Sequence, residues 1–298
     1  MELGIFGLPS GKMTFMEAVD YAKEAGIDAL EPYPHAEFAQ PTDEAVEKAK
    51  ELKAYAAEKG IKINCFSMGI NITTGDTIAA NIERLKGYAR VAAAMGSPFL
   101  HHTLMPQLVS DFTSNIKFDE FLSRAVKGIT EVYDYAASVG VEAVYEDQGF
   151  VFNGCQRFER LINAVDRDLR IVADLGNIKF VGEDPVDFVG QFAPYVAHVH
   201  VKDYLYKPAT ANFPGEEWYT TRNGDYLRGT IVGHGTIDFV TVCRILISAG
   251  YTGSFSLEFD GKEDHFMADK LSSRNFRRYY AQAEAQLGVK NVKDVPFT

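Results

Sequence analysis

The chain has 298 residues, of which 46% are hydrophobic and 24% charged, the balance of an ordinary soluble globular protein. Its net charge of −11 disfavours the phosphate backbone as a partner, so we expect no nucleic-acid binding. We see neither a signal peptide nor the run of about 20 apolar residues that spans a bilayer. Three widely spaced cysteines suit a reducing compartment, so we predict a cytoplasmic protein without a membrane partner.

Short β-rich runs alternate with longer amphipathic helical patterns along the whole chain. The predicted strands are Leu3–Phe6, Ala29–Pro32, Lys62–Phe66, Phe99–His102, Val141–Glu146, Arg170–Asp174, Val196–Val201 and Ser254–Phe259. The predicted helices are Thr14–Ala25, Thr42–Lys59, Asn81–Met95, Asp119–Ser138, Arg157–Val165, Pro185–Phe192, Asp238–Ala249 and His265–Leu287.

Eight such units predict an α/β fold, a (β/α)₈ TIM barrel forming a single domain over residues 1–298. Several helices end in a glycine suited to a left-handed cap, followed by a short loop into the next strand. The main rival is an open doubly wound sheet, but the GxGxxG turn typical of that fold is missing after the first strand. The barrel is therefore the favoured architecture.

One long segment, residues 203–236, follows the seventh strand and is predicted to be an irregular loop over the active site. It carries the single tryptophan of the chain, Trp218, among several tyrosines. Aromatic faces suit the apolar side of a sugar ring, so Trp218 is a candidate substrate-binding residue. A contact between copies of a homo-oligomer explains the same aromatic content equally well.

Strand parity directs four polar side chains to the mouth of the predicted barrel. Glu146, Asp174, His200 and Glu258 each lie at or near the end of a successive strand, with His198 on the same face as His200. Three carboxylates and an imidazole need a compensating cation in a poorly solvated cavity. Oxygen-rich ligands with one imidazole suit a divalent metal, Mn²⁺ or Mg²⁺ first, with Co²⁺, Fe²⁺ or Zn²⁺ as alternatives.

The runs VYEDQG, VADLGN, VHVKD, GHGTIDF and SLEFDG make the chain resemble the xylose isomerase-like TIM barrel superfamily, which includes sugar isomerases, epimerases, inosose dehydratases and apurinic-site endonucleases. The resemblance implies that Glu146, Asp174, His200 and Glu258 are the metal ligands. It also implies that Glu146 and Glu258 form the acid/base pair. Where epimerases commonly have a histidine, this chain has Asn177, which could bind a substrate hydroxyl but not transfer protons.

Two further residues are candidates close to this centre. Lys202, at the rim, would either stabilise a developing enolate oxygen or pair with Asp203 or a ligand carboxylate. Hydrophobicity suggests that Phe99 faces the helices. Strict alternation then turns His102 toward the interior as a candidate base, although a lone histidine is as often structural. His198 would orient a ligand carboxylate from behind.

The remaining candidates lie at the rim. His234, between two glycines, would border the substrate or cap the following helix, and Arg228 would meet an anionic group or only solvent. Glu31 and His35 are weaker candidates.

These residues predict a divalent-metal-dependent sugar isomerase or epimerase, which removes a proton beside a carbonyl and passes through an enediolate bound to the metal. The alternative is a lyase that cleaves 3-oxo-C-glycosides. The segment EWYTTRNGDYLRGTIVGHG resembles the C-glycoside deglycosidase branch, whose members usually work with a small partner subunit and in which His102 would be the base. A non-catalytic sugar-binding protein is a third, disfavoured, possibility. The substrate is in each case a small carbohydrate.

Overall fold

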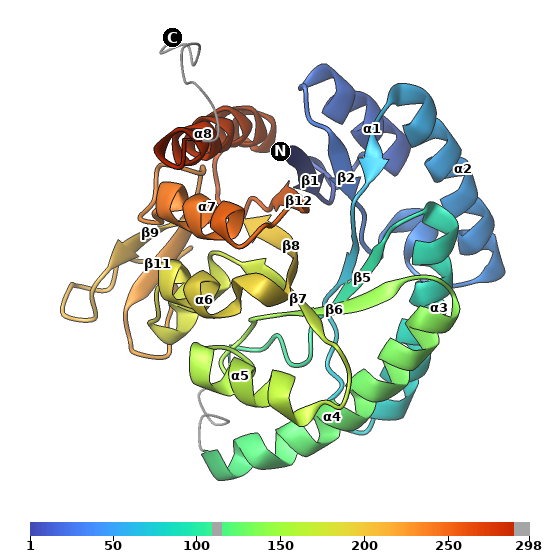
Figure 1. Ribbon diagram of the computed structural model, residues 1–298, viewed down its shortest axis with the longest axis horizontal. Coiled ribbons are helices and arrows are strands. Elements are labelled where there is room, and N and C mark those ends of the chain that lie inside the picture. Colours follow the sequence, from blue (N-terminus) through green and yellow to red (C-terminus); the bar gives the residue numbers. More distant parts are fainter. Residues whose placement is uncertain (109–114, 289–298) are drawn as a thin grey trace.

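The computed structural model describes residues 1–108 and 115–288 as a barrel of parallel strands ringed by helices (Figure 1). Its strands are β1 (Glu2–Phe6), β2 (Ala29–Glu31), β3 (Lys62–Ile63), β4 (Phe66–Met68), β5 (Phe99–His102), β6 (Glu142–Glu146), β7 (Arg170–Asp174), β8 (Val196–Val201) and β12 (Ser254–Leu257). The α-helices are α1 (Phe15–Glu24), α2 (Asp43–Lys59), α3 (Ile78–Met95), α4 (Asn115–Ser138), α5 (Cys155–Ala164), α6 (Pro185–Phe192), α7 (Phe239–Ser248) and α8 (His265–Gln286). Short 3₁₀ segments occupy Ala36–Phe38, Asn177–Val181 and Ala193–Tyr195. The predicted fold is confirmed.

The strand order is β3-β2-β1-β12-β8-β7-β6-β5-β4, and every pair is parallel. The single strand predicted over Lys62–Phe66 is in fact two short strands. β3 pairs with β2, whereas β4 pairs with β5. The two ends of the sheet are therefore consecutive pieces of one chain segment, which nearly closes the barrel.

Local sequence signals set the helix ends. Thr14 and Glu17 form the capping box at the start of α1, each side chain bonding the backbone N–H of the other. Gly60 ends α2 in the left-handed conformation, φ +74°, that a residue with a side chain rarely adopts. No α-helix among the described residues is both long and apolar enough to cross a membrane.

The floor of the barrel is apolar. Val144, Val172 and Ala197 form an isolated interior cluster against which Phe99 packs. Their strands run from this floor to a polar mouth, so the inner face of each strand changes from apolar to charged along its length. Phe99 therefore faces inward, contrary to the prediction.

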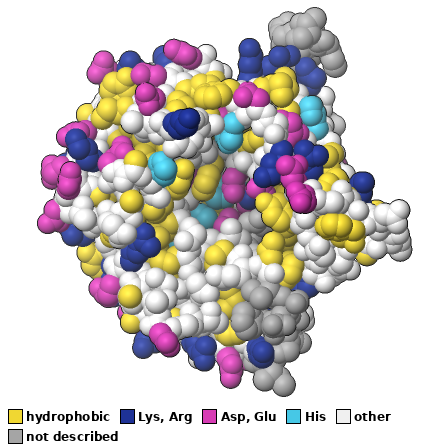
Figure 2. All heavy atoms as spheres, turned by 180° about the vertical axis from the view of Figure 1, so that it is seen from behind, with side chains coloured by type: hydrophobic (Ala, Val, Ile, Leu, Met, Phe, Trp, Pro, Cys, Tyr) yellow, Lys and Arg dark blue, Asp and Glu magenta, His cyan; other side chains and the backbone are white. Residues whose placement is uncertain are grey.

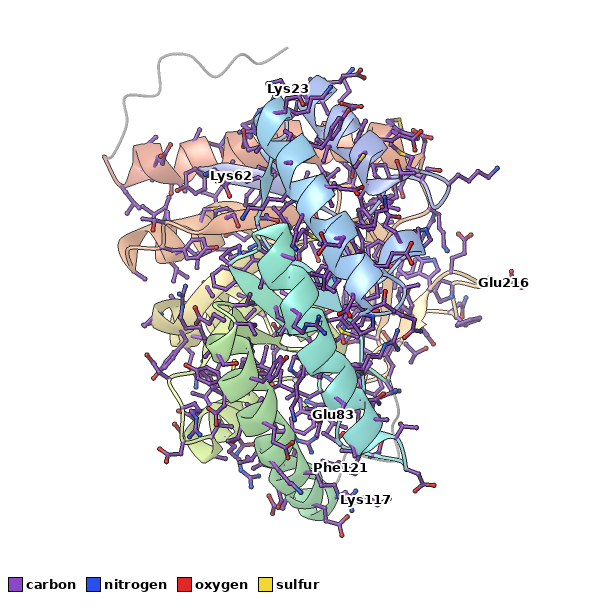
Figure 3. The ribbon with its side chains drawn as sticks, turned by 90° about the vertical axis from the view of Figure 1, so that its right-hand side faces the viewer. Lys23, Lys62, Glu83, Lys117, Phe121 and Glu216 are labelled. Atoms are coloured by element: carbon purple, nitrogen blue, oxygen red, sulfur yellow. The ribbon has the colours of Figure 1, made fainter. Side chains whose placement is uncertain are left out.

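The segment 203–236 is not an irregular loop. It contains a three-stranded antiparallel sheet of β9 (Asp203–Lys207), β10 (Tyr219–Thr220) and β11 (Tyr226–Thr230), in the order β10-β11-β9. In the side view of Figure 3, Glu216 of this segment projects at the end of the molecule opposite Lys62, which begins β3. The small sheet therefore belongs to the end where the barrel strands finish.

Hydrogen bonds join the two ends of this segment and fix it to the barrel. The Asp203 carboxylate accepts backbone N–H groups from Tyr204 and from four residues of the stretch 233–237, at 2.9–3.3 Å. The Tyr204 hydroxyl donates to Asp260 Oδ2 at 2.9 Å, and the Tyr219 hydroxyl reaches Asp260 Oδ1 at 3.3 Å. The two tyrosine bonds tie the small sheet to the chain that follows Glu258.

Candidate metal and acid/base site

The four predicted ligand residues converge at the mouth of the barrel. The Nδ1 atom of His200 lies 3.3 Å from Glu146 Oε2, 3.3 Å from Glu258 Oε2 and 3.7 Å from Asp174 Oδ2. Asp174 and His200 are register partners on β7 and β8, while Glu146 ends β6 and Glu258 follows β12. Figure 2 shows this face hollowed at its centre, with histidine and acidic side chains at the bottom of the hollow.

The arrangement fits a divalent cation. Within the described part of the chain, His200 Nδ1 is buried without a hydrogen-bond partner although three carboxylates surround it. Ligand atoms of Asp174, His200 and Glu258 lie within 4.8 Å of one another, as do those of His101, Glu146 and His200. A buried imidazole nitrogen facing several carboxylate oxygens is a ligand set that Mn²⁺, Mg²⁺ and Zn²⁺ accept to different degrees.

Lys202, predicted at the rim, is buried within the same cluster, and Asn177 lies beside it. Lys202 Nζ is 2.9 Å from Asp174 Oδ2 and 2.8 Å from Glu258 Oε1, and it donates to Asn177 Oδ1 at 3.4 Å. The Asn177 amide donates in turn to Glu146 Oε2 at 3.5 Å. Burial opposes the charge on Lys202, but Asp174 and Glu258 outweigh it and hold the pKa of the ammonium well above its usual value.

The two glutamates of the predicted acid/base pair have opposite environments. Burial opposes ionisation of Glu146, yet His101 and His200 outweigh it and lower the pKa of this carboxyl. Burial raises the pKa of Glu258 to about 7, with Lys202 lowering it and Asp174 raising it again. Two carboxyl groups with separated pKa values are the usual basis for one acting as acid and the other as base.

The prediction that His102 faces the interior is wrong. His102 pairs in register with Tyr145, packs edge-on against that ring at 4.9 Å, and bonds the Thr103 carbonyl through Nδ1. His101 instead points inward, with Nε2 3.4 Å from Glu146 Oε1. The error comes from Phe99, which packs into the apolar barrel floor rather than against the helices and so reverses the alternation along β5.

Two further residues, Glu31, which sequence reasoning ranked low, and Ser67, which it missed, complete the site. Glu31 is fully buried at the end of β2 and contacts both His198 Nε2 and His200 Nε2 at 2.8 Å. His198 has the predicted orientation, but the carboxylate that it contacts is Glu31 and not a predicted ligand. Ser67 donates to Glu31 Oε1 and lies 3.0 Å from His101 Nδ1. The register of β4 with β5 places Ser67 beside His101.

The rim candidates do not join this buried cluster. His234 is exposed, and Asp238 caps α7, so His234 is not the cap. Arg228 Nη2 lies 3.7 Å from Glu217, and Lys207 lies over the Trp218 ring at 5.2 Å. Both contacts are within the segment 203–236, and substrate contacts for His234, Arg228 and Trp218 stay predictions.

Comparison with known proteins agrees with the architecture. The sequence profile of the family described as "Xylose isomerase-like TIM barrel" matches residues 19–279. An inosose dehydratase of Clostridium botulinum (strain Alaska E43 / Type E3) is 25% identical over 163 residues, 54% of this chain and 53% of that protein. The match thus spans about half the length of this curated relative.

Solved structures superpose along almost the whole chain. An L-ribulose 3-epimerase has a TM-score of 0.74 and 16% identity, covering 99% of this chain and 100% of its own. The IOLI protein, whose structure holds a zinc atom, has a TM-score of 0.73 and 17% identity, covering 95% of this chain and 99% of its own. At these identities the likeness concerns the fold.

Proposed function

The chain belongs to the xylose isomerase-like TIM barrel family, and on that premise we propose that it is a divalent-metal-dependent isomerase or epimerase of a keto-sugar or related polyol derivative. The observation that carries the proposal is the convergence of Glu146, Asp174 and Glu258 on the unpartnered Nδ1 of His200. A bound divalent ion would polarise a substrate carbonyl as a Lewis acid. We favour Mn²⁺ as the ion, with zinc as the precedent in a relative of the same fold.

The proposed chemistry assigns different tasks to the two glutamates. β6 and β12 are separated by β7 and β8 in the sheet, so Glu146 and Glu258 flank Asp174 and His200. One carboxylate takes the proton from the carbon beside the carbonyl; the electron pair of that C–H bond forms a C=C bond, and the π pair of the carbonyl moves onto its oxygen. Return of a proton to the other face of the same carbon gives an epimer, and return to the adjacent carbon gives an isomer.

Lys202 and Asn177 support these steps in the proposal. The Lys202 ammonium lies between Asp174 and Glu258, where it could also stabilise negative charge developing on a substrate oxygen. Asn177 contacts Glu146 and Lys202, so its amide could orient a substrate hydroxyl but transfers no proton.

A lyase is the second candidate, favoured by the inosose dehydratases among the relatives. The first step is the same proton removal, after which a group β to the carbonyl leaves with its bonding electrons instead of a proton returning. Cleavage of 3-oxo-C-glycosides would follow this course. The histidine available as a base in this lyase would be His101, which points into the site, and not His102, which packs against Tyr145.

The test is a substrate panel of free ketoses, phosphorylated ketoses, cyclic keto-polyols and 3-oxo-glycosides, assayed in D₂O on protein of measured metal content. We expect deuterium to enter the carbon beside the carbonyl. Glu146→Gln and Glu258→Gln should each abolish this exchange. Glu142→Gln, on the same face of β6 but paired with Arg170 at the other end of the strand, should leave it unchanged. Exchange that survives in both site variants overturns the proposal, and release of an eliminated group selects the lyase.

A further inference from the structure

We infer that Glu31 is the positioning residue of this site: one buried carboxylate orients two imidazoles, His200 directly and His101 through Ser67, so that each turns its other ring nitrogen toward Glu146. The part concerning His200 rests on the proposed function, because it assumes that the site holds a metal. The part concerning His101 does not.

The first step concerns His200. A carboxylate is an acceptor, so the 2.8 Å contacts of Glu31 Oε1 with His200 Nε2 and of Oε2 with His198 Nε2 require a hydrogen on each Nε2. His198 Nδ1 is then free to accept from Ser254 Oγ at 3.0 Å. With its hydrogen on Nε2, a neutral His200 keeps its lone pair on Nδ1, the atom that faces the three carboxylates. A carboxylate behind a ligand histidine is a common means of fixing ring orientation and raising ligand basicity.

The second step concerns His101. Ser67 has one hydroxyl hydrogen, and its contact with Glu31 Oε1 uses that hydrogen because a carboxylate oxygen accepts. Ser67 Oγ must then accept from His101 Nδ1, which lies 3.0 Å away. The hydrogen of His101 is thereby fixed on Nδ1, and Nε2 is left directed at Glu146 Oε1 at 3.4 Å. In the described chain, this Nε2 has no hydrogen-bond partner.

These contacts place Glu31 behind the site rather than in it. Among the described residues, the partners of its carboxylate are His198, His200 and Ser67, all buried, and it reaches Glu146 through the imidazoles of His200 and His101. A competing arrangement uses Glu31 itself as a ligand, since ligand atoms of Glu31, His198 and His200 also lie within 4.8 Å of one another. The two arrangements differ in which nitrogen of His200 meets the ion, and this difference is measurable.

The experiment is nitrogen-15 NMR of the histidine side chains in the Zn²⁺-loaded protein, with signals assigned through His101→Gln, His198→Gln and His200→Gln. We expect a hydrogen on Nε2 of His200 with the metal shift on Nδ1, and a hydrogen on Nδ1 of His101. In parallel, Zn²⁺ affinity is measured by chelator competition on three variants. Glu31→Gln should weaken binding about 10–100-fold. Ser67→Ala should leave the affinity unchanged but lose the fixed hydrogen position on His101.

Ser254→Ala is the matched control, because Ser254 contacts the far nitrogen of His198 and not Glu31; it should change neither readout. A metal shift on Nε2 of His200, an unchanged affinity in Glu31→Gln, or a hydrogen on Nε2 alone in His101 overturns the inference. If Glu31→Gln does not fold, the spectrum of the wild-type protein still decides. If the wild-type protein binds no divalent ion, it is the proposed function that fails. The spectrum of the metal-free protein then still tests whether the hydrogen of His101 is on Nδ1.

Discussion

Replacing Lys202 by methionine should make folding of this protein depend on a divalent metal. The side chain is only 5% exposed, and its ammonium lies 2.9 Å from Asp174 and 2.8 Å from Glu258. Methionine keeps the approximate length of the side chain but leaves these carboxylates without that cation. Breaking a buried ion pair by removing one partner costs about 3–5 kcal/mol. We take about 3 kcal/mol, because the Glu258 side chain is 24% exposed and solvent screens part of the loss.

The assay is urea unfolding with EDTA and with saturating MnCl₂. In EDTA, Lys202→Met should lose about 3 kcal/mol relative to the wild type. Added Mn²⁺ should recover most of this loss, because the ion neutralises the same carboxylates and stabilises the folded state that binds it. Lys207→Met, which removes an exposed cation beside Trp218, should stay within about 0.5 kcal/mol of the wild type in both conditions.

Two results would refute this reasoning. If Lys202→Met is as stable as the wild type in EDTA, the ammonium is not compensating Asp174 and Glu258. If the variant loses the same free energy with and without Mn²⁺, the carboxylates around Lys202 are not the metal site. In the second case the proposed function would lose its structural basis as well.

Three other substitutions test separate contacts. Asp203→Asn replaces one of two carboxylate oxygens that together accept five backbone N–H groups. Each N–H left unpaired costs about 1–3 kcal/mol, so we expect urea unfolding to show that the variant loses about 2–4 kcal/mol of stability. The control is Asp238→Asn at the exposed cap of α7, which should lose almost no stability. Burial lowers the pKa of His102 from 6.5 to about 4. As the pH falls, the unfolded chain therefore protonates this imidazole before the folded chain does. The stability that the neutral His102 contributes is complete above pH 6.5 and falls by about 3 kcal/mol as the pH drops to 4. Unfolding curves measured over this pH range should show the fall in the wild type but not in His102→Gln. In Gly229→Ala the new Cβ would clash with the backbone carbonyl of Asp260, so the thermal midpoint and the Zn²⁺ affinity should both drop, and an unchanged affinity would show that the clash is absorbed away from Glu258.

The sequence predicts the charged half of the site well because β6, β7 and β8 have five or six residues each. Over that length the side chains alternate visibly, so His198, His200 and Lys202 must share a face whatever the exact strand ends are. The carboxylates at the ends of the neighbouring strands then follow from the parallel order, which the alternation of strands and helices itself predicts.

The sequence fails at β5 because hydrophobicity does not tell the two faces of a barrel strand apart. The outer face packs against helices, and the inner face packs into an apolar floor, so Phe99 fits either side. When Phe99 is assigned to the outer face, alternation assigns His101 to the outer face and His102 to the interior, the reverse of what the structure has. The neighbouring strand β4 has only three residues, too few for alternation to identify Ser67 as inward.

The small sheet was missed for a similar reason, since β10 has two residues. Asn223 and Gly224 between β10 and β11 are nevertheless residues typical of a hairpin turn, and the Gly224 N–H donates to the Thr221 carbonyl. A segment as long as 203–236 seldom lacks secondary structure, so this Asn-Gly pair could have identified the hairpin from sequence.

The residues that the sequence predicts and those that it misses lie on different strands of the barrel. β6, β7, β8 and the end of β12 supply the charged groups, which sequence patterns reveal, whereas β2, β4 and β5 supply Glu31, Ser67 and His101, which only the register brings together. If orientation is the task of the second set, substitution of Glu31 should change how tightly an ion binds and substitution of Ser67 the hydrogen position on His101, while substitutions of the first set should change whether an ion binds at all. Sequence variation in β2, β4 and β5 among related barrels would then adjust the reactivity of a common ligand set without altering its composition.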